Sequence, residues 1–214
     1  MFPTDDGTGK IENRIKLIKA DNHGSNSWNS NGSNNWAKPT TLNVILNETY
    51  WTTIDEKYQQ YIGNAKYYLG GYNSNLNIRT NVMHQYERKA EGSSYYYSGN
   101  PTNWTGKIAL MYASDYGYGA NSACSENTNL YDYESNYCPN NNWLYLGGGD
   151  YEWLLPHASF DSSYAFIVAP NGWASSHGEI DGITVVRPVF YLTSDAEFND
   201  IGDGSQGNPY QLLR

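Results

Sequence analysis

The sequence predicts a mixed α+β fold built from small antiparallel sheets, with one or two helices in the N-terminal half and long loops. Residues 164–169 form a short apolar run, and the Asn171-Gly172 pair after it is the dipeptide most typical of a two-residue β-hairpin. Residues 183–192 carry apolar side chains on both faces, as one long strand buried between two layers does. Residues 40–63 show the periodicity of a helical region.

A strand and a loop precede these helices. Residues 14–20 alternate charged and apolar side chains, the pattern of a half-buried strand. Residues 21–38 are rich in Asn, Ser and Gly and predict a long loop, which Trp28 and Trp36 are expected to pin to the core; tryptophans that contact a ligand are the alternative. Residues 41–46 predict a short helix. A second, amphipathic helix follows, with a buried stripe of Trp51, Ile54, Tyr58, Tyr61 and Ile62.

The middle of the chain predicts shorter elements. Residues 66–71 read as a strand, and residues 81–91 carry helix formers. Residues 93–105 are expected to form a loop. Residues 107–112 are apolar enough for a buried strand, and the Gly- and Tyr-rich residues 114–119 predict a turn.

The last elements complete a single domain over residues 1–214, with residues 1–13 flexible. Residues 143–146 are a short aromatic segment ahead of three glycines. Residues 211–214 predict a final edge strand paired with residues 14–20, which would bring the two ends of the domain together.

Composition and charge restrict the partners and the location. The 214 residues include 21 Tyr, 7 Trp and 21 Gly but only 16% charged residues, which argues against disorder and is typical of loop-rich extracellular domains. The net charge of −9 predicts no nucleic-acid partner and no contact of the domain itself with an anionic membrane. We expect an extracellular domain on a bacterial cell surface, anchored by a segment outside these residues; a cytosolic protein is the plain alternative.

Two cysteines, Cys124 and Cys138, flank a loop rich in Asn, Tyr and acidic residues. A closed zinc site needs four ligands, so two cysteines without a histidine cluster do not predict one. In an extracellular domain we expect a disulfide, which would contribute about 3 kcal/mol by restricting the unfolded chain. Two free thiols are the alternative.

Several segments together resemble a known group of proteins. They are Arg-Ile-Lys-Leu-Ile-Lys-Ala-Asp (14–21), Lys-Ile-Ala-Leu-Met-Tyr-Ala-Ser-Asp-Tyr-Gly-Tyr (107–118), Val-Val-Arg-Pro-Val-Phe-Tyr-Leu (185–192) and Gly-Asp-Gly-Ser-Gln-Gly-Asn-Pro-Tyr (202–210). Their order resembles the C-terminal ectodomains of prepilin-like or adhesin-like surface proteins of gut Firmicutes. This resemblance covers nearly the whole chain and carries no known chemistry.

The closing part, with Trp153 and an apolar hairpin that ends in Val-Arg-Pro-Val, is similar to the C-type-lectin-like class. That class includes the formylglycine-generating-enzyme fold and the variable proteins diversified by retroelements. The diversified proteins build their ligand face just before the final strand, which corresponds to residues 151–181 here. The resemblance therefore implies a glycan or protein ligand on a cell or phage surface. Formylglycine chemistry does not carry over, because Cys124 and Cys138 precede the hairpin.

Residues 151–181 hold the candidate ligand-binding residues. Side chains two apart on a strand share a face. The eight candidates, including the alternating run after the hairpin turn, are Tyr151, Asp161, Ser163, Trp173, Ser175, His177, Glu179 and Asp181. A solvated polar face without a ligand is the alternative. Imidazole and carboxylates are also suitable ligands for a divalent metal, so a metal site formed by His177, Glu179 and Asp181 is a further hypothesis.

Two acidic turns, residues 5–9 and 200–204, place oxygens as calcium loops do, although neither has the full EF-hand spacing. Calcium is thus a possible cofactor, and turns without metal are the alternative. Arg187 is a charge within an apolar strand, and we expect it to be structural and bonded to loop carbonyls or to an acid such as Asp115.

The sequence thus favours a non-enzymatic recognition or adhesion domain. The alternative is the structural head of a pilin-like filament subunit. A carbohydrate hydrolase is a third hypothesis. That chemistry needs two carboxylates across a sugar, and nothing in the sequence singles out such a pair.

Overall fold

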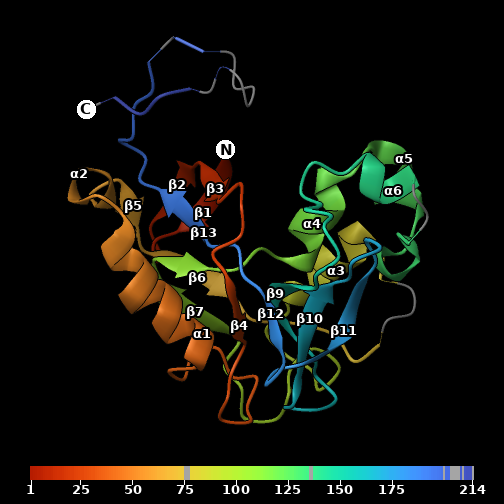
Figure 1. Cartoon of the computed structure of the whole chain (residues 1–214). Helices are drawn as coiled ribbons and strands as arrows, with labels where there is room; N and C mark the ends of the chain where they lie inside the picture. Colours follow the sequence, from red (N-terminus) through yellow and green to blue (C-terminus); the bar gives the residue numbers. More distant parts are fainter. Residues whose placement is uncertain (75–77, 135–136, 200, 203–207, 209, 214) are drawn as a thin grey trace.

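The structure is a computed structural model that describes residues 1–74, 78–134, 137–199, 201–202, 208 and 210–213. Its architecture is mixed α+β, with several small sheets and short helices, as the sequence predicts (Figure 1). Helix α1 and the group of helices α4 to α6 lie on opposite sides of the molecule in this view.

The largest sheet has five strands in the order β11-β10-β9-β12-β4. Its strands pair antiparallel except for β12 beside β9. They are β4 (Ser25–Ser27), β9 (Glu152–His157), β10 (Tyr164–Val168), β11 (Ala174–Glu179) and β12 (Ile183–Val185).

A second sheet is centred on β13, which pairs antiparallel with three other strands. The partner strands are β3 (Lys16–Ile18), β5 (Ile62–Gly63) and β8 (Ile108–Ala109), and β13 itself spans Val189–Leu192. Two antiparallel pairs complete the described strands: the hairpin of β1 (Phe2–Asp5) with β2 (Ile11–Arg14), and β6 (Ala65–Tyr68) with β7 (Asn103–Gly106).

The helices are short. The first helical region comprises α1 (Thr41–Val44), a π-helical turn η1 (Ile45–Tyr50), a 3-10 turn η2 (Trp51–Thr53) and α2 (Glu56–Gln59). The others are α3 (Thr80–Glu87), α4 (Ala113–Gly119), α5 (Ser122–Asn127), the 3-10 turn η3 (Leu130–Asp132) and α6 (Tyr137–Asn140).

The first helical region does not contain the predicted long amphipathic helix. Ile54 is extended (φ −80°, ψ 126°), and Asp55 starts a new helix by accepting a hydrogen bond from the Lys57 backbone N–H (3.1 Å). The predicted stripe is therefore divided. Tyr58 is 39% exposed, whereas Ile62 is buried in strand β5.

The central strands β9 and β10 of the five-stranded sheet are buried on both faces. Trp153 and Ile167 belong to one core cluster, which also contains Leu42 of α1. Leu154 and Phe166 belong to a second cluster, formed with residues of α3, α4 and α5. Successive strand residues point to opposite faces, so β9 is buried along its whole length and links the two clusters.

The two tryptophans of the long N-terminal loop are buried, as predicted, and the alternative of a ligand contact is wrong. Trp28 is 0% and Trp36 is 1% exposed, and their ring centroids lie 5.2 Å apart. The Trp28 indole N–H also donates to the Leu154 carbonyl (3.3 Å). These contacts hold the loop against the large sheet.

The predicted long strand over residues 183–192 is two strands in two different sheets. Strand β12 ends at Val185 and β13 begins at Val189. Between them Pro188 lacks a backbone N–H and cannot donate to a ladder, and Arg187 turns into the interior. This connection joins the two sheets.

Arg187 is 4% exposed and bonds to an acid and to a loop carbonyl, as predicted, but the acid is Glu152 rather than Asp115. Its guanidinium donates to both carboxylate oxygens of Glu152 (Nε–Oε1 2.6 Å, Nη2–Oε2 2.9 Å) and to the Leu144 carbonyl. Asp115 instead pairs with Lys16. Burial raises the pKa of Glu152, against the opposing charge of Arg187.

Two other segments, one in the middle and one at the start of the chain, also differ from the sequence predictions. Residues 114–119 lie in helix α4 rather than a turn, because carboxylates cap its N-terminus and outweigh the low helix propensity of its glycines. Residues 2–14 form the β1–β2 hairpin rather than a flexible segment.

The predicted edge pairing of residues 211–214 with residues 14–20 is also wrong. Leu212 bridges to Phe198, and strand β3 pairs with β13 instead. Residue 214 lies outside the described residues.

Replacing Arg187 with Met should lower the free energy of unfolding by about 3–5 kcal/mol, because Glu152 would remain buried without its partner. Thermal and urea unfolding measure this change. The double variant Arg187→Met/Glu152→Met removes both charges and should recover most of the loss. An unchanged melting curve for the single variant would contradict the structural role of Arg187.

Candidate functional site

The predicted ligand face does not form one continuous face, because a β-bulge interrupts strand β11. Ala165 pairs with Gly178 and Ile167 pairs with Ser175, so β11 advances three residues while β10 advances two. The extra residue breaks the period of two. Ser175 is consequently 1% exposed, whereas His177 and Glu179 lie at the surface.

The other predicted residues separate into small groups. Trp173 contacts the rings of Tyr151 (centroids 6.3 Å apart) and Tyr131 (5.5 Å) at one end of the sheet. His177 contacts Phe160 (5.2 Å) and Tyr164 (6.0 Å) instead.

The remaining predicted residues lie in turns. The Asp161 carboxylate accepts from the Ser163 backbone N–H (2.8 Å) in the turn before β10, and Asp181 lies in the turn after β11. Of the two predicted aromatic residues, Tyr151 is exposed, whereas Trp173 is partly buried against the core.

A serine beside a histidine on β11 raises the question of nucleophilic chemistry. Ser175 Oγ lies 3.4 Å from His177 Nδ1, and Ser176 Oγ lies 3.5 Å from the same nitrogen. Both serines are at most 1% exposed, so a substrate cannot approach their oxygens in this conformation. The arrangement satisfies buried hydroxyl groups rather than presenting a nucleophile.

The predicted calcium sites receive no support from the side-chain positions. In the first acidic turn, Asp5 Oδ1 accepts from the backbone N–H groups of Gly7 (2.8 Å) and Gly9 (3.0 Å), and these bonds lower the pKa of Asp5. The second turn, residues 200–204, lies largely outside the described residues. Within the described residues no three His, Cys, Asp or Glu side chains form a metal-binding group, those near His177 included.

A different surface has the features of a binding site. Trp143 is 75% exposed and Tyr118 is 56% exposed, and both line one open hollow of about 510 Å³. We call this hollow the Trp143 surface, which comprises Tyr118, Gly119, Ala120, Asn121, Asn140, Asn141, Asn142 and Trp143.

The exposure of Trp143 follows from its neighbours. Asn142 is 6% exposed and Leu144 is 4% exposed. The Asn142 carboxamide donates to the Tyr116 carbonyl (2.9 Å) and accepts from the Leu144 backbone N–H (3.0 Å). Because both neighbours are anchored inside, the side chain between them points to solvent.

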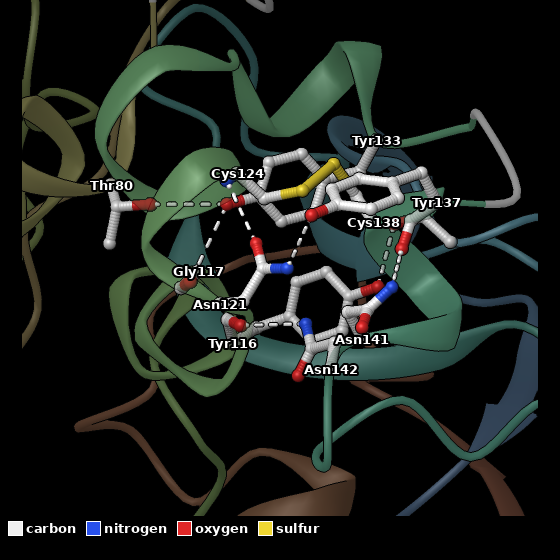
Figure 2. Close-up of a disulfide and its surroundings, with 11 residues drawn as sticks. Thr80, Tyr116, Gly117, Asn121, Cys124, Tyr133, Tyr137, Cys138, Asn141 and Asn142 are labelled. Carbon is white, nitrogen blue, oxygen red and sulfur yellow. Dashed lines mark hydrogen bonds between the residues drawn. A yellow bond between two sulfur atoms is a disulfide. The ribbon is translucent and has the colours of Figure 1, made fainter.

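A disulfide holds this surface together, as predicted. Cys124 of α5 and Cys138 of α6 are bonded, and carboxamides tie the same segments (Figure 2). The Asn121 side chain donates to the Tyr137 hydroxyl (2.9 Å), and the Asn141 side chain donates to the Tyr137 carbonyl (2.8 Å). The Trp143 backbone N–H donates to the Gly119 carbonyl (3.2 Å), which joins this region to α4.

The predicted hairpin also supports this region. Its turn has three residues, 170–172, rather than two, since the Ala169 N–H donates to the Trp173 carbonyl (2.8 Å). The Tyr116 hydroxyl donates to the Gly172 carbonyl (2.7 Å), and the Tyr145 hydroxyl donates to the Pro170 carbonyl. Gly172 has φ +94°, and a Cβ there would lie 2.2 Å from Pro139, so only glycine fits.

Helix α4, which carries Tyr118, is fixed by two carboxylates at its N-terminus. Asp115 accepts from the Tyr112 N–H (2.8 Å), and Glu87 accepts from the Ser114 N–H (2.9 Å) and hydroxyl. Glu87 is fully buried. Burial raises its pKa to about 7, despite the opposing effects of Arg88 and of the Ser114 hydrogen bonds.

An apolar groove of about 310 Å³ lies on the other side of Trp143. Apolar side chains of β1, β3 and β13 contribute to it, and it shares Tyr118, Gly119 and Trp143 with the Trp143 surface. Its charged residues, Lys16 and Asp115, form an ion pair with each other. Trp143 therefore stands between an apolar groove and a hollow lined by carboxamides.

The chain matches no protein-family model, no curated protein and no solved structure. In the part of the chain that the structure describes, no helix has the length and apolar character needed to cross a bilayer.

Sequence reasoning missed the Trp143 surface, although a signal was present. Asn140-Asn-Asn-Trp143 places a tryptophan in a run of polar residues directly after Cys138. Apolar residues 144–146 follow it, however, so the sequence assigned Trp143 to an aromatic segment and did not reveal its exposure.

Removing the disulfide with Cys124→Ser/Cys138→Ser should lower the free energy of unfolding by about 3 kcal/mol. The disulfide closes a loop between residues 14 apart in sequence, and without it the unfolded chain regains conformational entropy. Urea unfolding with and without a reductant measures the effect. A reductant should destabilise the wild type and leave the double variant unchanged. Equal stabilities of the two oxidised proteins would contradict the expectation.

Glu87 should make the protein less stable as the pH rises from about 4.5 to 7. Its folded pKa of about 7 lies above the ordinary value of 4.5, so the folded state holds the proton more tightly, and deprotonation favours unfolding. Urea unfolding at pH 4.5 and pH 8 measures this loss. Between the two pH values the free energy of unfolding of the wild type should fall by up to about 3 kcal/mol more than that of Glu87→Gln. Identical pH dependence in both proteins would refute it.

Proposed function

We propose that this protein is a non-enzymatic, extracellular recognition domain of the C-type-lectin-like class. It would bind a glycan or protein ligand on a cell or phage surface, as part of an adhesin-like surface protein. The mixed α+β architecture with small sheets and the sequence resemblance support the class. The disulfide supports an extracellular location, because such bonds persist mainly in oxidising compartments.

One observation carries the proposal: an exposed tryptophan and an exposed tyrosine line a hollow on a cross-linked platform. Large aromatic side chains contribute contact area with few rotatable bonds, and carboxamides beside them adapt their hydrogen bonds to a ligand. A platform held by a disulfide and by side-chain hydrogen bonds loses little conformational freedom on binding.

The predicted surface around Tyr151 and Trp173 remains a second candidate region for contacts. Tyr151 is 45% exposed and Tyr131 is 41% exposed, and both lie against Trp173. No cavity described above is lined by any of the eight predicted residues. We therefore assign the main contact to the Trp143 surface.

Fluorescently labelled protein should bind specific spots on a combined glycan and protein array, in calcium and in chelator alike. The double variant Tyr118→Ala/Trp143→Ala should lose at least tenfold in affinity while keeping its melting temperature. The matched control Tyr58→Ala/Ile183→Ala removes two exposed apolar side chains elsewhere and should bind as the wild type does.

Other results would favour the alternatives. Concentration-dependent assembly without any bound ligand would favour the structural head of a pilin-like filament. Cleavage of a glycosidic substrate would favour a hydrolase. Binding abolished by chelator would require a metal ion in the site and would revise the assignment.

A further inference from the structure

We infer that the Trp143 surface binds an electrically neutral glycan, a sugar chain without carboxylate, sulfate or phosphate groups, with one ring stacked on Trp143. This inference rests on the proposed recognition function and names its ligand class. It follows from the charge, the aromatic exposure and the hydrogen-bonding groups of the hollow.

The hollow contains no charged residue among those that line it: two aromatic residues, two small residues and four asparagines. An anionic glycan would therefore find no Lys or Arg partner there. The net charge of −9 further disfavours anionic ligands. Lys16, in the adjoining apolar groove, is already neutralised by Asp115. A cationic ligand would likewise lack a carboxylate in the hollow.

The aromatic residues suit the apolar face of a sugar. A pyranose ring has one face formed largely by C–H groups, and its rim carries hydroxyl groups. The indole of Trp143, 75% exposed, offers a broad flat surface for that face. Tyr118 lines the same hollow, with its ring centroid 6.2 Å from that of His84.

The asparagines divide into those that hold the platform and those that can reach a ligand. Asn142 is occupied at both ends of its carboxamide, and Asn121 donates to Tyr137 while accepting from the Cys124 N–H. Asn141 uses its nitrogen for the Tyr137 carbonyl, which leaves its side-chain oxygen. The exposed Asn140 side chain makes no hydrogen bond to any residue that the structure describes.

Sugar hydroxyl groups both donate and accept, and so do carboxamides. Asn140 and Asn141 thus provide the polar rim that complements a hydroxyl-bearing ligand. The volume of about 510 Å³ lies within the usual range of about 300–1,000 Å³ for ligand clefts. The geometry is that of a shallow site for a short stretch of a neutral glycan chain.

A glycan array that pairs neutral oligosaccharides with the sialylated and sulfated forms of the same cores tests this inference on the full chain. We expect binding to neutral members, with at least tenfold weaker binding of their charged forms. Calorimetry with the best neutral oligosaccharide then gives the affinities of variants.

Trp143→Ala should weaken binding at least tenfold, and Trp143→Phe, which keeps an aromatic face, should weaken it less than fivefold. Asn140→Asp should weaken it severalfold because the amide donor is lost. The matched control Asn31→Asp makes the same change at another exposed asparagine and should have no effect. Melting temperatures should stay within a few degrees, since both replaced side chains of the site are exposed.

Three outcomes would overturn the inference: no neutral glycan bound, stronger binding of the charged forms, or full affinity in Trp143→Ala. The recognition function is tested separately. If no neutral glycan binds but an array protein does, and Tyr118→Ala/Trp143→Ala abolishes that binding, recognition stands and the glycan is excluded. If neither glycan nor protein binds, both proposals fail.

Discussion

The burial of one guanidinium is the constraint on which much of this structure depends. Arg187 lies between β12 and β13, so its position is tied to both sheets. A buried charge must be paired and hydrogen-bonded, and Glu152 of β9 together with the Leu144 carbonyl provides these partners. The connection between β12 and β13 is thereby held against Leu144 and the start of β9.

That point also determines where the candidate site lies. Leu144 is held by Arg187 through its carbonyl, and the Asn142 carboxamide is held by Tyr116. With both neighbours inside, Trp143 is forced outward, although the hydrophobic effect would favour its burial. The disulfide and the docked hairpin turn then keep the surrounding segments in place. The exposed tryptophan is thus a consequence of anchored neighbours rather than of a mobile loop end.

The sequence predicted those features that depend on local chemistry. The hairpin at Gly172, the disulfide and the buried Trp28 each follow from one residue type and its immediate surroundings. The sequence prediction failed where contacts with distant residues determine the local structure. Helix α4 depends on the carboxylate of Glu87, 26 residues before its first residue, and the break at Pro188 was hidden within an apolar run.

The site shows the same division for a different physical reason. Alternation along a strand assigns side chains to one face only while each residue pairs with one residue of the neighbouring strand. The bulge beside Ser175 shifts this register, and the sequence of β11 alone does not reveal the shift. The exposure of Trp143 likewise depends on partners of Asn142 and Leu144 in other segments. Composition indicated a surface rich in Tyr and Asn, but only the tertiary contacts decide which of these residues can face a ligand. A neutral hollow on an acidic protein is therefore a property of the assembled fold, and it gives the site a selectivity that the net charge alone does not explain.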